Sequence, residues 1–215
     1  MQELLSGIYR FQHRVFTSQR NRFRRLEAGQ HPSALFITCS DSRIDPSLLT
    51  QTRPGELFIM RNVGNIVPRY RSDGIGEAAA IEYAVSVLKV QDVVVCGHSH
   101  CGAMSGLLNP ELLAETPAVS GWLAHAKETA RIMCEQYPHL TEASARLVAA
   151  IEENVLVQLE NLRTHPAVAA ALSRDTLNLH GWVYQFETGK VFTFETQKHK
   201  FVEFDKNGGL EIVNE

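Results

Sequence analysis

The chain has 215 residues, 44% of them hydrophobic and 21% charged, which fits one soluble globular domain with a single buried core. Its net charge of −3 argues against a nucleic-acid-binding protein, which usually carries a basic excess. The N-terminus lacks the apolar core of a signal peptide, and no run approaches the roughly 20 apolar residues of a membrane span. We therefore expect a cytoplasmic protein with reduced thiols and no membrane or nucleic-acid partner.

The first 28 residues have apolar side chains at helical spacing. This pattern predicts one long amphipathic helix that ends near Gly29. We expect residues 1–28 to form an N-terminal helical arm that docks on a second subunit. The apolar positions are Leu4, Ile8, Phe11, Val15, Phe23 and Leu26.

The rest of the chain alternates apolar strands with helical patterns, which predicts an α/β fold. Continuous apolar runs are typical of buried parallel strands, so we expect a mostly parallel sheet flanked by helices, with about four parallel strands and an antiparallel edge strand. The whole chain, 1–215, is predicted to form a single domain. The expected strands are 34–38, 57–60, 92–96, 177–184 and 191–194, the last two in a hairpin, and the expected helices are 76–90, 119–137, 141–162 and 167–172.

Two short motifs follow the first and third predicted strands. Cys39 is followed by Asp41 and Arg43, and His98 is followed by Cys101. Ligands of open α/β sheets gather at the carboxyl ends of the strands, where both motifs begin. Two thiolates and an imidazole are a ligand set for zinc that leaves a fourth position open to water. His100 competes with His98 for the imidazole position, and spacing does not decide between them.

Because of its charge, such a centre needs neighbouring side chains to make the zinc-bound water reactive. Two thiolates neutralise Zn²⁺, so the metal acidifies water less than it does with three imidazoles. Asp41 is placed to orient the bound solvent, and Arg43 is placed to hold Asp41 and keep it ionised. A local salt bridge without a catalytic role is the alternative for this pair.

The motifs C-x-D-x-R and H-x-x-C resemble the signature of the β-class carbonic anhydrases, and so do the flanking segments 53–58, 61–65 and 80–85. The similarity is strongest over residues 30–108 and extends more loosely over almost the whole chain. It implies one Zn²⁺ per subunit, bound by Cys39, His98 and Cys101, and reversible hydration of carbon dioxide by attack of zinc-bound hydroxide. It also favours His98 over His100 as the ligand.

Four further residues match the plant-like branch of this family: Gln30, Phe58, Tyr83 and Gly102. The resemblance implies that they bind substrate and that the first three come from a partner subunit, which makes a homodimer or higher homo-oligomer necessary. Phe36 and Thr38 replace the residues that mark an inhibitory bicarbonate pocket in the other branch. We therefore expect an open site with water on zinc, the alternative being a closed site in which Asp41 ligates the metal.

Segments 97–104 and 179–182 are most similar to cyanobacterial, carboxysome-associated members. The resemblance adds carboxysome shell proteins to the candidate partners and the carboxysome to the candidate locations. Those members often carry a long C-terminal extension, whereas this sequence stops at Glu215, soon after the last expected strand. Two alternatives remain open: a hydrolase of CS2 or COS on the same scaffold, and a zinc-stabilised carboxysome assembly module without turnover.

Overall fold

The computed structural model describes residues 1–72 and 76–204, and the chain divides into two compact units, Met1–His31 and Pro32–Glu215. The first unit is helical but is not the single helix predicted. The backbone at Gln19 leaves the helical region, with φ −113° and ψ 20°, so the helix is interrupted there. The arm contains α1 (Gln2–Arg10), a π-helical stretch (Phe11–Val15), α2 (Phe16–Ser18) and α3 (Arg20–Glu27).

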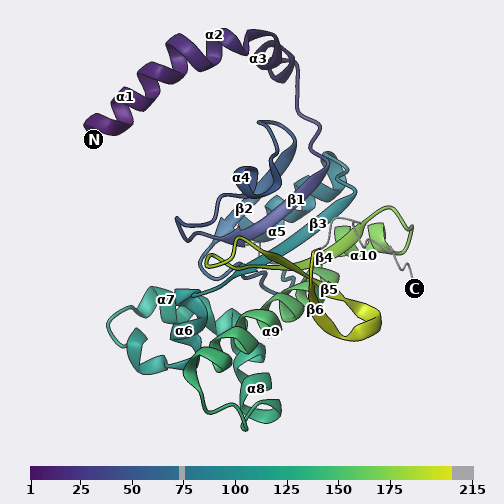
Figure 1. The fold of residues 1–215 in the computed structure, drawn as a ribbon. Coiled ribbons are helices and arrows are strands. Elements are labelled where there is room, and N and C mark those ends of the chain that lie inside the picture. The colour runs from purple at the N-terminus through teal and green to yellow at the C-terminus, as the bar shows by residue number, and fades with distance from the viewer. Residues whose placement is uncertain (73–75, 205–215) are drawn as a thin grey trace. The chain divides into compact units, whose positions relative to one another are not determined.

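The second unit is built on a six-stranded sheet with the order β2-β1-β3-β4-β5-β6 (Figure 1). The first four strands of that order are parallel, as predicted, and the last two are antiparallel. The edge therefore has two antiparallel strands instead of one. The strands are β1 (Ala34–Cys39), β2 (Leu57–Asn62), β3 (Asp92–His98), β4 (Asn178–Tyr184), β5 (Val191–Glu195) and β6 (Lys200–Glu203).

The central strands β1 and β3 are buried on both faces, which explains their continuous apolar sequences. Side chains alternate between the two faces of a strand. Leu35 and Ile37 accordingly join the larger core cluster, and Phe36 joins a second cluster on the other face with Val94 and the Cys96 thiol.

Helices cover the sheet, and α9 runs along β3 and β4 (Figure 1). The predicted helix over 119–137 is divided into α7 and α8 by a 3-10 turn at Ala124–Ala126, and the short helices α4 and α6 were not predicted. The helices are α4 (Pro46–Thr50), α5 (Gly76–Glu82, continued by a π-helical turn, Tyr83–Val87), α6 (Gly102–Leu108), α7 (Pro117–Leu123), α8 (Lys127–Gln136), α9 (Ala143–Arg163) and α10 (Pro166–Leu172). Short 3-10 segments also occur at Pro110–Leu113 and Thr196–Lys198.

The topology leaves one favoured place for a site. After β1 the chain forms β2 on one side, and after β3 it forms β4 on the other, so the carboxyl ends of β1 and β3 lie at a topological switch point. Among residues 1–72 and 76–204, no helix has both the length and the apolar character needed to cross a membrane.

Candidate metal centre

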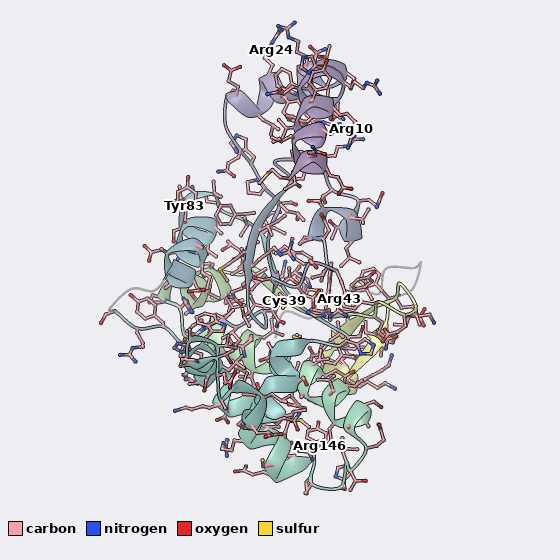
Figure 2. The ribbon with its side chains drawn as sticks, turned by 90° about the vertical axis from the view of Figure 1, so that its left-hand side faces the viewer. Arg10, Arg24, Cys39, Arg43, Tyr83 and Arg146 are labelled. Carbon is pink, nitrogen blue, oxygen red and sulfur yellow. The ribbon has the colours of Figure 1, made fainter. Side chains whose placement is uncertain are left out.

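Cys39, His98 and Cys101 lie together at the carboxyl ends of β1 and β3. Cys39 is the last residue of β1, His98 is the last residue of β3, and Cys101 precedes the first turn of α6. Their two sulfur atoms and the histidine nitrogen all lie within 4.8 Å of one another, and all three residues are buried. Figure 2 shows Cys39 and Arg43 together near the middle of the second unit. The structure thus brings together the three residues predicted as ligands.

A backbone hydrogen bond orients the imidazole of His98. Its Nδ1 lies 2.8 Å from the carbonyl oxygen of Ser99, to which it donates a hydrogen bond. Its Nε2 is buried and has no hydrogen-bond partner within the part of the chain that the structure describes. A buried ring nitrogen rarely stays unpartnered, so this atom fits a metal ligand. The ring of His100 instead contacts the Glu187 carboxylate, outside the cluster.

The thiols of Cys39 and Cys101 shift each other's pKa in opposite directions. The pKa of Cys39 falls to about 4, chiefly because the Cys101 thiol donates a hydrogen bond to its sulfur, although burial acts in the opposite direction. The pKa of Cys101 is raised, because Cys39 holds its proton and because the thiol is buried. A cation between them would allow both sulfurs to be thiolates. By contrast, burial alone raises the pKa of Cys96 to about 12, as expected of an inert strand thiol.

Asp41 and Arg43 form a bidentate ion pair beside this cluster. Arg43 Nε donates to Asp41 Oδ1 at 2.9 Å, and Nη2 donates to Oδ2 at 2.7 Å. These hydrogen bonds hold the pKa of Asp41 well below its usual value. Oδ2 also lies 3.9 Å from His98 Nε2, so the carboxylate borders the cluster.

Two residues that support the cluster, Phe186 and Glu187, were not predicted from the sequence. The Phe186 ring lies 5.0 Å from the ring of His98 and 4.7 Å below the Arg43 guanidinium, measured to ring centroids. The next residue, Glu187, accepts a hydrogen bond from Ser99 Oγ at 2.9 Å. Both residues follow the end of β4 at the same edge of the sheet, and that position is the signal that would have pointed to them.

The residues predicted to bind substrate lie on separate elements. Phe58 on β2 and Tyr83 after α5 have ring centroids 6.0 Å apart, and Tyr83 is 44% exposed. Gly102 is the first residue of α6. Gln30 is exposed and belongs to the other compact unit, Met1–His31.

The chain is similar to carbonic anhydrases in both sequence and structure. A family model described as "Carbonic anhydrase" matches residues 34–191. A carbonic anhydrase of Pseudomonas aeruginosa is 50% identical over 99% of this chain and 96% of its own length, and one of Synechocystis is 47% identical over 94% of this chain and 74% of its own. The structure of the β-carbonic anhydrase CcaA has a TM-score of 0.91 at 47% identity, covering 94% of this chain and 98% of that one. A tetrameric β-carbonic anhydrase of Sordaria macrospora has a TM-score of 0.80 at 29% identity, covering 89% and 95%.

Proposed function

The chain belongs to the β-class carbonic anhydrases, and from this membership we propose that it is a zinc enzyme that hydrates carbon dioxide reversibly to bicarbonate and a proton. The observation that carries the zinc proposal is the convergence of two sulfurs and one imidazole nitrogen within 4.8 Å. Cys39, His98 and Cys101 would hold the ion, and two thiolates with an imidazole suit zinc and leave one position open.

When bound by these ligands, zinc would act as a Lewis acid and make water a nucleophile near neutral pH. The protein supplies orientation and proton handling. Asp41 Oδ2 lies beside His98 Nε2 and keeps acceptor capacity beyond its bond to Arg43, so it can accept a hydrogen bond from the attacking water. Arg43 holds the carboxylate ionised and in place. A closed site, in which Asp41 ligates the metal, would have to give up part of the bidentate pair with Arg43, so we favour the open site.

For the substrate we propose a pocket shared between subunits. Phe58 and Tyr83 would give it an apolar wall, Gly102 would allow close approach at the start of α6, and Gln30 would donate a hydrogen bond to the substrate. The exposure of Tyr83 supports this arrangement, since a 44% exposed ring is available to a second chain. The tetrameric Sordaria macrospora relative supports a homo-oligomer. Location in the cytoplasm or a carboxysome, and recruitment by shell proteins, remain predictions.

Stopped-flow carbon dioxide hydration with a pH indicator tests the activity directly. The zinc-loaded chain should hydrate carbon dioxide well above the buffer rate. Cys39→Ser should lose both zinc and activity, whereas Cys134→Ser, which changes an exposed cysteine on α8, should keep both. A sample with one zinc per chain and no rate above buffer would refute the proposal. Sulfide release from COS or CS2 by that sample would favour the hydrolase alternative, and no turnover at all would favour the assembly module.

Subunit mixing tests the shared pocket. We expect Gln30→Ala and Asp41→Asn chains to be weakly active alone. If Gln30 serves the partner's site, each mixed dimer contains one site with both defects and one intact site. Random mixing should then restore about a quarter of the wild-type activity. A mixture no more active than the mean of its parents, with subunit exchange verified by mass spectrometry, would show that each chain uses its own Gln30.

A further inference from the structure

The segment that follows β2, residues 64–70, is buried over Gly64–Pro68 yet lies in neither a helix nor a strand. Buried backbone polar groups need hydrogen-bond partners, and an irregular segment cannot find them in a sheet ladder. Side chains on one face of α9 provide them instead. The amides of Asn154, Gln158 and Asn161 bond to the segment's backbone at 2.9–3.0 Å, and all three are buried.

The ladder is continuous along the helix. Asn154 Nδ2 donates to the Gly64 carbonyl at 3.0 Å, and Asn161 Nδ2 donates to the Val67 carbonyl at 2.9 Å. Between them Gln158 donates to Asn154 Oδ1 at 2.9 Å and accepts from the Val67 N–H at 2.9 Å. Each amide therefore fixes its neighbour as well as the backbone, and the segment is held in one register on α9.

Gly64, at the first rung, also touches the candidate metal centre. Its N–H donates to Cys39 Sγ at 3.4 Å. Its φ is +81°, and a Cβ there would meet the Cβ of Ala103, the second residue of α6, at 2.9 Å. Only glycine fits this position. Gly64 thus bonds to one thiol-bearing residue and packs on the helix that begins after Cys101, while Asn154 holds its carbonyl.

We propose that Asn154 is a positioning residue of the metal centre, which holds Gly64 so that its N–H donates to the Cys39 sulfur. The inference rests on the proposed zinc function. Two thiolates cancel the charge of Zn²⁺ and weaken it as a Lewis acid. A hydrogen bond to one sulfur withdraws part of that negative charge, and partners of this kind tune a metal's affinity and reactivity. The Asn154 amide therefore contributes to the acidity of the metal as well as to packing.

The Co²⁺-substituted protein gives a readout separate from activity. A sulfur that accepts a hydrogen bond is a poorer electron donor, so its sulfur-to-cobalt charge-transfer band lies at higher energy. Asn154→Ala should move this band to longer wavelength, speed transfer of zinc to a chelator roughly tenfold or more, and lower kcat. Asn161→Ala is the matched control, because it removes the same kind of buried amide bond three residues along the segment. It should leave the band and the zinc release rate unchanged.

The outcomes separate this inference from the proposed function. No charge-transfer band in the wild-type Co²⁺ protein would remove the thiolate metal site itself. A normal wild-type band that Asn154→Ala leaves unmoved, or that both variants move equally, would overturn the role of Asn154 alone. Asn154→Ser, too short to reach the Gly64 carbonyl, replaces the alanine variant if that one does not fold. If neither folds, Gly64 amide exchange decides. It should be at least roughly tenfold slower in the zinc protein than in the metal-free protein, and equal rates would refute the proposal.

Discussion

Arg61 Nη2 donates a hydrogen bond to the carbonyl oxygen of Asp41 at 2.6 Å. The same guanidinium donates from Nε to the carbonyl oxygen of Cys39 at 3.1 Å. Arg61 lies on β2, next to β1, so one side chain fixes the backbone on both sides of Ser40. These two hydrogen bonds fix the backbone at the end of β1 and at Asp41, and so help to position the Asp41 carboxylate.

Replacing the Arg61 guanidinium should disturb the candidate metal centre without removing any proposed zinc ligand. Lysine keeps the charge but is a single point donor, so Arg61→Lys should lose one of the two carbonyl contacts. We expect kcat/KM for carbon dioxide hydration to fall roughly 10- to 100-fold, with zinc retained. Stopped-flow assays and metal analysis on the same sample check this. Wild-type kcat/KM in Arg61→Lys would show that the loop holds its position unaided.

Asp41→Asn should reduce turnover much more than it reduces stability. The amide is nearly isosteric, but it donates where the carboxylate accepts, and it loses the bidentate ion pair with Arg43. We expect kcat to fall about 10²- to 10⁴-fold, the usual contribution of positioned acid–base groups. Asp45→Asn is the control. It removes the same charge nearby, yet asparagine can still cap α4 by accepting from the Leu48 N–H, as Asp45 does at 2.9 Å. If kcat falls equally in both variants, the loss of negative charge alone explains the effect, and Asp41 has no special role.

Glu187 should control how long the centre keeps its metal. Its carboxylate binds Ser99 Oγ and the His100 ring, the two residues between His98 and Cys101. Glu187→Ala frees that turn, in which His100 has a φ of +54°, so zinc release to a chelator should accelerate roughly tenfold. Glu195→Ala removes an ion pair with Lys198 in the neighbouring β5–β6 hairpin and should leave release unchanged. If zinc release is unaltered in Glu187→Ala, the contacts of Glu187 with Ser99 and His100 do not help to retain the metal.

The main part of the candidate metal centre could be predicted from the sequence, because parallel strands place their carboxyl ends together. The pairing of Cys39 with His98 was predictable because both end buried parallel strands. Phe186 and Glu187 also follow a parallel strand but were missed, because their contacts with Ser99 and His100 join residues 87 or 88 positions apart. Helix α6 was missed for a different reason. It contains Gly102 and Gly106, each costing a helix about 1 kcal/mol relative to alanine, so tertiary contacts decide its conformation. At Gly106 the contact is close, because a Cβ would meet Leu113 at 2.9 Å.

The stability of the fold should depend on pH through His165. This residue is 2% exposed; its Nε2 donates to the Pro68 carbonyl at 3.0 Å, and its ring packs against Tyr70. Burial lowers its pKa by penalising the charged ring, whereas an unfolded histidine titrates near its usual pKa of about 6.5. Above that pH the His165 ring is neutral in both the folded and the unfolded chain, so it does not change the free energy of unfolding. Below it the unfolded state binds a proton first, so the free energy of unfolding falls as pH decreases towards the lowered pKa.

His165→Gln removes this titration and keeps an N–H that can reach the Pro68 carbonyl. Urea unfolding at a series of pH values should show a smaller loss of stability below pH ~6.5 in the variant, with the slopes differing by at most one proton, about 1.4 kcal/mol per pH unit. The difference between the two proteins at pH ~8, where histidine is neutral in both states, measures the change in packing and serves as the internal baseline. Parallel curves across the whole range would mean that His165 takes up its proton as readily in the folded chain as in the unfolded one.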